Sequence, residues 1–201
     1  LRLGEIGGQW RLVLRIAALV SFANVVFYVL FVYLVDFSGH QVGSSLGQAN
    51  ATSTVIQTLG LPLVVLGGVL VDRYGQVPVN RFGNLLLAFI TPVALPLVQL
   101  GGPMGLWLGQ ALGVLPVMLT MGAQGVMAVE LVPVRQRCTV FSIAYSLAMA
   151  LFAGTAPVVC SWLLEKQLWQ WGPALYCSLY AIPALWAVGV VRLPALPGQP
   201  R

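Results

Sequence analysis

The chain has 201 residues, of which 59% are hydrophobic and only 7% are charged, and its mean hydropathy is +0.90. A water-soluble domain of this size needs more polar surface, so the composition indicates a helical bundle embedded in a lipid bilayer. The formal net charge is +5, but no basic cluster interleaved with aromatic residues accompanies it, which argues against nucleic acid as a partner.

Six segments are long and apolar enough to cross a bilayer as helices. In chain order they are Ile16–Val35, Thr54–Val71, Phe82–Leu100, Gly105–Val129, Thr139–Leu164 and Pro173–Val191. The connections between them are short, so we expect consecutive helices to be antiparallel neighbours. The sequence thus predicts an all-α membrane protein with three parts: an N-terminal cytoplasmic segment (1–15), a six-helix transmembrane bundle (16–191) and a C-terminal cytoplasmic tail (192–201).

The arginines predict the orientation of this bundle, because an even number of spans places both termini on one side. Nine arginines fall on that side: Arg2, Arg11, Arg15, Arg73, Arg81, Arg135, Arg137, Arg192 and Arg201. The opposite side receives only Lys166. Basic residues concentrate in cytoplasmic loops, so the pattern predicts a multi-pass protein of the cell membrane with both termini in the cytoplasm.

A short charged loop joins the second and third spans and reads G-G-V-L-V-D-R-Y-G-Q-V-P over positions 67–78. Asp72 and Arg73 stand at the end of an apolar helix, where an aspartate opposes the helix dipole and requires a partner. Three glycines allow close approach of other backbone and a tight turn: Gly67, Gly68 and Gly75. An ordinary cytoplasmic turn that carries Asp-Arg is the alternative interpretation.

Small residues predict where helices pack closely. Gly105, Gly109 and Gly113 recur every fourth residue along the fourth span. Such spacing permits one helix backbone to approach another inside a membrane. A sliding surface for a rocking motion is the alternative to simple packing, and the residues alone do not separate the two.

Polar side chains within the spans are the candidates for contact with a solute. They are Asn24, Tyr28, Gln110, Gln124, Tyr145, Ser146 and Thr155. At about 1.5 Å per residue, Asn24 lies roughly 13 Å along its helix from Arg15 and therefore near mid-membrane. Tyr28 follows one turn later on the same face. Hydrogen bonding to neighbouring helices, worth only about 1 kcal/mol each, is the alternative role for all of them.

The cysteines and the single histidine argue against an enzyme and against a metal or cofactor site. Cys138, Cys160 and Cys177 are odd in number and widely spaced, which is typical of buried hydrophobic residues rather than metal ligands. A membrane serine protease needs a buried Ser-His pair, but the sole histidine, His40, falls between the predicted spans. A six-helix channel or scaffold acting as a homodimer, or a non-transporting fragment, remains the alternative to a carrier.

Residues 130–157 read E-L-V-P-V-R-Q-R-C-T-V-F-S-I-A-Y-S-L-A-M-A-L-F-A-G-T-A-P. This stretch resembles the metabolite:proton symporter branch of the major facilitator superfamily, the carriers for proline, betaine and citrate. The matching positions are Pro133, Arg137, Thr139, Ala144, Ser146, Gly154, Thr155 and Pro157. The loop at 67–78 resembles that superfamily's signature between its second and third helices, and Asn24 and Tyr28 match the branch's seventh helix.

The resemblance implies the C-terminal six-helix half of an alternating-access carrier, built from two inverted three-helix units. The solute would be an organic acid, an amino acid or a betaine-like molecule, bound by Asn24, Tyr28 and Tyr145. The resemblance also implies a cytoplasmic gate, formed by Gly68, Asp72, Arg73 and Gly75, with Arg135 and Arg137 on the same face.

The chain also departs from that family's pattern. After Gly75 the family usually has two basic residues, whereas this chain has Gln76 and Val77. None of the six spans has a charged residue or histidine near its centre, although coupling to a proton requires a titratable group in the membrane. The coupling group is therefore expected in a missing N-terminal half, or the carrier is not proton-driven. The start at Leu1 without a methionine favours a cut through a longer protein, and a second copy is the other candidate partner.

Overall fold

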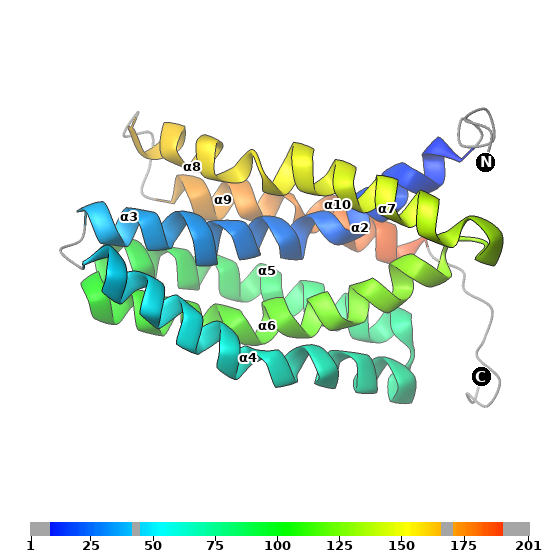
Figure 1. Ribbon diagram of the computed structural model, residues 1–201, viewed down its shortest axis with the longest axis horizontal. Helices are drawn as coiled ribbons and strands as arrows, with labels where there is room; N and C mark the ends of the chain where they lie inside the picture. Colours follow the sequence, from blue (N-terminus) through cyan, green and yellow to red (C-terminus); the bar gives the residue numbers. More distant parts are fainter. Residues whose placement is uncertain (1–8, 42–44, 166–170, 191–201) are drawn as a thin grey trace.

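The computed structural model describes residues 9–41, 45–165 and 171–190, and every regular element in them is a helix. The first membrane-crossing stretch joins α2 (Trp10–Tyr28), the π-helical turn η1 (Val29–Tyr33) and α3 (Leu34–Gln41). The long helices α4 (Leu46–Tyr74), α5 (Gln76–Leu100) and α6 (Gly102–Glu130) follow. Figure 1 shows these helices running side by side along the long axis of the molecule.

The last third of the chain is built from shorter pieces. The 3₁₀ turn η2 (Val134–Gln136), α7 (Arg137–Ala148), the π-helical turn η3 (Met149–Ala153) and α8 (Ala156–Glu165) form the fifth crossing. The sixth consists of α9 (Gly172–Leu179) and α10 (Ala181–Gly189). The predicted all-α membrane architecture is therefore confirmed. Lys166, Arg2, Val191 and the predicted tail at 192–201 lie outside the described residues.

Two features differ from the predicted spans. Five helical stretches are long and apolar enough to cross a membrane within the described residues, because the sixth is interrupted at Tyr180. Pro183 explains the interruption, since it has no N–H to donate to the carbonyl of Leu179 one turn earlier. The other helices begin or end beyond the apolar segments. For example, α4 begins eight residues before Thr54 because Ser45 and Gln48 form a capping box there.

The helix α6 packs closely against α4 and α5 through glycines. A Cβ atom built on Gly105 would lie 2.1 Å from the carbonyl oxygen of Leu97 on α5, and one on Gly67 would lie 2.4 Å from the carbonyl oxygen of Leu119 on α6. Only glycine permits such backbone contact. The predicted close packing along the fourth span is thus confirmed, although Gly113 faces the Leu30 side chain of η1 rather than α5.

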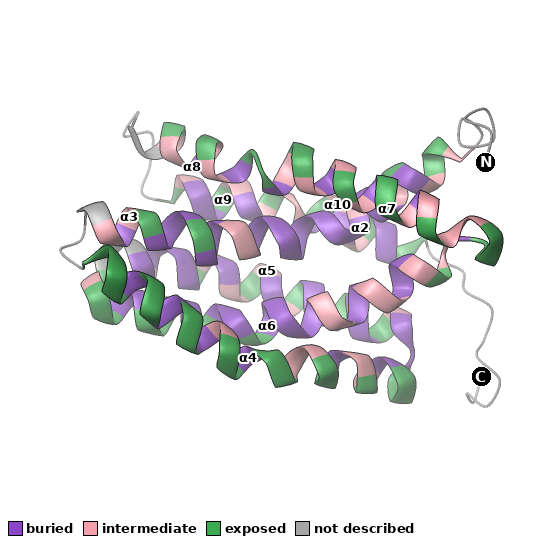
Figure 2. Cartoon of the chain, viewed as in Figure 1, coloured by how far each residue is buried: buried purple, intermediate pink, exposed green. Residues whose placement is uncertain are grey.

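The buried side chains form two main clusters along the length of the bundle. The first, which we call the inner cluster, joins Ile16, Leu19 and Val20 of α2 to Met127 and Ala128 of α6, among others. The second is larger, and we call it the middle cluster. It includes residues of α2, η1, α3, α4, α5, α6, α8, α9 and α10. In Figure 2 the central α2 stretch is mostly buried, whereas α4 is largely exposed along its outward face. Among the long described crossings, α4 and the stretch that includes α7 and α8 are the least buried.

Candidate solute-binding site and inner loops

Asn24 and Tyr145 meet at the contact between α2 and α7. The Asn24 Nδ2 atom donates to the carbonyl oxygen of Val20 at 2.6 Å, which leaves its Oδ1 atom as the acceptor. The Tyr145 hydroxyl donates to that Oδ1 atom at 3.3 Å. Asn24 is 2% exposed, while Tyr145 is half-buried. Two predicted site residues that are far apart in the chain are therefore brought together near the middle of the α2–α3 stretch.

Tyr28 lies on the same side of α2 as Asn24, one turn further along. It is partly exposed. The three side chains present two phenol rings and their hydroxyl groups beside a buried amide. Such a group can accept and donate hydrogen bonds and can offer aromatic faces to a cation.

Gln110 serves a different site. Its Nε2 atom donates to the carbonyl oxygen of Leu30 at 2.9 Å and lies 3.5 Å from the Ser53 hydroxyl oxygen. Leu30 is part of the π-helical turn η1, where backbone carbonyls lose their regular helical partners. Gln110 is fully buried, so its observed role is to satisfy this irregular turn.

Gln124 and Ser146 make no described hydrogen bond to Asn24 or Tyr145. Gln124 is 3% exposed, and its Oε1 atom has no hydrogen-bond partner in the part of the chain that the structure describes. Ser146 is exposed on α7, next to Tyr145 in the chain but on an adjoining face. The structure thus groups three of the seven candidates for solute contact, and the assignment of all seven to a solute stays a prediction.

Several buried polar residues were missed by sequence reasoning. Asn80 and Asn84 on α5 are both fully buried, as is Thr120 on α6. The four-residue spacing of Gln76, Asn80 and Asn84 was the available signal, because it puts three amides on one helix face. A search for polar residues spaced four apart at the start of the third span would have identified Asn80 and Asn84.

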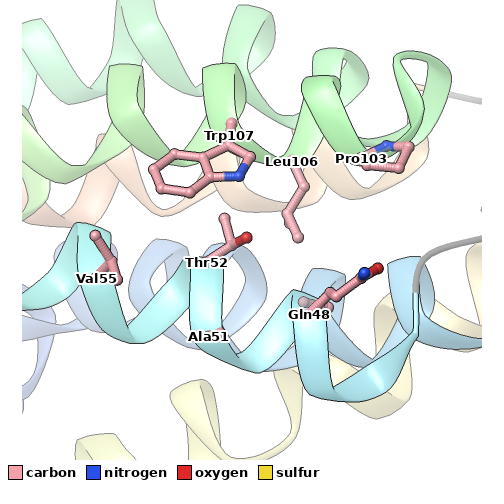
Figure 3. A pocket seen from close by; sticks show the side chains of 8 residues that line it. Gln48, Ala51, Thr52, Val55, Pro103, Leu106 and Trp107 are labelled. Carbon is pink, nitrogen blue, oxygen red and sulfur yellow. The ribbon is translucent and has the colours of Figure 1, made fainter.

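A groove lies between the first turns of α4 and the start of α6. Its volume is about 430 Å³, and it is lined by Gln48, Ala49, Ala51, Thr52, Val55, Pro103, Leu106 and Trp107. Figure 3 shows Thr52 pointing from α4 toward Leu106 and Trp107 on α6. None of the predicted solute contacts lines this groove, so it is separate from the Asn24–Tyr145 contact.

The turn between α4 and α5 has the predicted geometry. Gly75 lies between the last residue of α4 and the first residue of α5. Its φ is 90°, a backbone conformation that favours glycine. The close approach expected at Gly68 is not found, since a Cβ built there has no described neighbour within 4 Å. Gly67, one residue earlier, makes that contact instead, because successive helix residues point about 100° apart.

The charged groups of this turn are exposed. Asp72 makes no ion pair with any residue that the structure describes. The Arg73 guanidinium carbon lies 5.6 Å from the centroid of the Tyr74 ring. Both side chains are therefore free to meet groups outside this bundle, and their predicted role in a gate stays a prediction.

The departure at Gln76 has a structural counterpart. Gln76 is 5% exposed, and its Nε2 atom donates to the Glu130 carboxylate at the end of α6. The neutral amide thus contacts a carboxylate without contributing a positive charge of its own. Nearby, Arg137 donates from Nε to the carbonyl oxygen of Val132 at 3.4 Å, and Arg135 is exposed in η2.

Comparison with known proteins gives similar carriers over most of the chain. It is 26% identical over 181 residues to the ectoine/proline transporter ProP of Corynebacterium glutamicum, which covers 89% of this chain and 35% of that protein. It is 29% identical over 186 residues to the citrate-proton symporter of Klebsiella pneumoniae, covering 89% and 40%. It is 28% identical over 179 residues to the proline/betaine transporter of Escherichia coli K12, covering 88% and 35%.

The chain therefore spans roughly a third to two fifths of the length of these curated relatives. No family model and no solved structure matches it. All three relatives are named as transporters, and the helices of this chain are those of a multi-pass membrane protein. The similarity to major facilitator transporters of the proline/betaine and citrate–proton symporter type, predicted from the sequence motifs, is thus confirmed.

Proposed function

We propose that this chain is the C-terminal six-helix half of a secondary transporter that moves a small polar solute by alternating access. The relatives support this proposal, because they are carriers for proline, betaine, ectoine or citrate and are more than twice as long as the matched part. The exposed sides of α4, α7 and α8 would face the remaining part of the protein, or a second copy of this chain.

The contact between Asn24 and Tyr145 is the observation that carries the assignment of the solute site. It joins two helices at mid-depth, and Tyr28 lies one turn beyond Asn24 on the same side of α2. Phenol rings attract cationic groups, so the site suits a solute with an ammonium centre, such as an amino acid or a betaine. A carboxylate on that solute would accept from the hydroxyl groups.

Asp72 and Arg73 would act at the cytoplasmic gate. The proposal places both chain termini and this turn in the cytoplasm, because basic residues gather on that side. Both side chains are exposed and free of described ion pairs, as a contact to the other half of the carrier would require. Alternating access would form and break that contact during each cycle.

Uptake by cells that produce the whole protein tests the solute site. Labelled proline, glycine betaine and citrate would be compared for wild type, Asn24→Leu and the control Tyr176→Phe. Tyr176 lies on α9, where its hydroxyl group pairs with that of Tyr180 at 3.1 Å, so its loss should leave uptake near wild type. Asn24→Leu should cut uptake of the transported solute at least tenfold, since one well-placed contact to a charged solute is worth about 1.5–3 kcal/mol.

Uptake by this variant tests whether Asn24 contacts the solute or only hydrogen-bonds to a neighbouring helix. Equal uptake by Asn24→Leu and wild type at equal membrane amounts would remove Asn24 from the solute site. If the wild type accumulates none of the three solutes, the proposal that it carries a solute of its relatives is wrong.

A further inference from the structure

A layer of buried polar side chains lies between the inner and middle hydrophobic clusters. On α5, Val77 packs against the inner cluster and Leu87 belongs to the middle one. On α6, Met118 belongs to the middle cluster and Met127 to the inner one. The layer between them consists of Asn80, Asn84, Thr120 and Gln124, each at most 3% exposed. We call these four residues the polar layer.

Contacts between α5 and α6 bring the polar layer together. Asn80 donates from Nδ2 to the carbonyl oxygen of Ala123, next to Gln124, at 3.1 Å. A Cβ built on Gly83, next to Asn84, would lie 2.6 Å from the Thr120 hydroxyl oxygen. The four side chains therefore gather within about two turns of the α5–α6 contact.

The hydrogen bonds of the two asparagines show which amide atom is paired and which is left without a partner. Asn80 uses its Nδ2 atom for the carbonyl oxygens of Gln76 and Ala123, and Asn84 uses its own for the carbonyl oxygen of Asn80. Since a carbonyl oxygen can only accept, each Nδ2 is assigned and each Oδ1 is left over. The hydrogen-bond partners therefore determine the orientation of both amide groups.

One side-chain oxygen of each polar-layer residue then remains without a described hydrogen-bond partner: Asn80 Oδ1, Asn84 Oδ1, Thr120 Oγ1 and Gln124 Oε1. Unpaired polar groups are costly inside a membrane protein, where bulk water is absent. Arg15 on α2 also has two buried nitrogen atoms, Nε and Nη2, without a described hydrogen-bond partner. Its guanidinium therefore does not hydrogen-bond to these oxygens directly.

We propose that the polar layer binds a small electropositive guest, either Na⁺ or ordered water, through these four oxygens. Neutral carbonyl and hydroxyl oxygens are ligands that hard cations accept. The same oxygens accept hydrogen bonds from water, and a buried water needs two to four polar partners. Because the layer contains no carboxylate, binding of either guest would not depend on the titration of the four side chains.

The test uses the purified whole protein with wild type, Asn84→Leu and the control Thr91→Val. Thr91 is a buried residue of the same helix whose hydroxyl is already paired with the Leu87 carbonyl oxygen at 2.7 Å. One readout is Tm in NaCl, KCl and choline chloride at equal ionic strength. The other is hydroxyl-radical oxidation of Met118 and Met127, which flank the layer and are at most 5% exposed, so that internal water must supply the radicals.

A bound Na⁺ predicts a Na⁺-specific rise in Tm of roughly 2–4 °C that persists in Thr91→Val and disappears in Asn84→Leu. Bound water predicts no such salt effect, but several-fold faster oxidation of the two methionines in wild type and Thr91→Val than in Asn84→Leu. Identical behaviour of all three proteins in both readouts overturns the proposal. Gln124→Met tests the same oxygens from α6 if Asn84→Leu does not fold, and neither readout depends on transport.

Discussion

At the scale of single residues, the site depends on side chains whose partners lie far away in the chain. Asn24 and Tyr145 are 121 positions apart and meet only because α2 packs against α7. The sequence could predict that each lies in a span, since both stand in apolar segments. It could not predict their contact, because the faces that α2 and α7 present to each other depend on the packing of the whole bundle.

The substitution Asp72→Ala tests the proposed gate. The carboxylate is exposed and unpaired in the described bundle, so its removal should not affect the packing of α4. Transport by the whole protein should fall at least tenfold, while the amount inserted in the membrane stays within about twofold. Uptake rates and quantitative membrane blots measure these quantities. Transport at the wild-type rate would leave Asp72 as an ordinary residue of the turn.

At the scale of helices, two adjacent glycines of α4 provide a matched pair. A methyl group on Gly67 would meet the backbone of Leu119, whereas one on Gly68 would meet open space. Gly67→Ala should therefore separate α4 from α6 and destabilise the fold by about 1–3 kcal/mol, and Gly68→Ala should have little effect on stability. Thermal unfolding of both variants measures the difference. Equal Tm values would contradict the observed contact.

The helices also show what apolar patterning can and cannot predict. Five of the six expected crossings are present as long apolar helical stretches, and the sixth is divided into α9 and α10. The ends of α4 depend on the capping residues Ser45 and Gly75, which hydropathy does not detect. Two members of the polar layer, Asn80 and Asn84, were missed for a related reason: they stand near the polar start of α5, where an amide is expected to face water.

At the scale of the whole molecule, the native cysteines test the proposed orientation. Cys138 is exposed near the start of α7, on the side proposed to be cytoplasmic, while Cys160 and Cys177 are buried. A maleimide that cannot cross membranes should label inverted vesicles but not intact cells, and Cys138→Ser should abolish the signal. Labelling of intact cells would place this end of the bundle outside.

The central claim is that this bundle is part of a carrier rather than a channel. The most direct measurement is solute flux into vesicles containing the purified whole protein, as a function of external solute concentration. The proposal predicts flux that saturates, together with exchange in which unlabelled solute inside accelerates entry of labelled solute. Flux that rises linearly with concentration and shows no such exchange would contradict it and would favour a six-helix unit assembled around a pore.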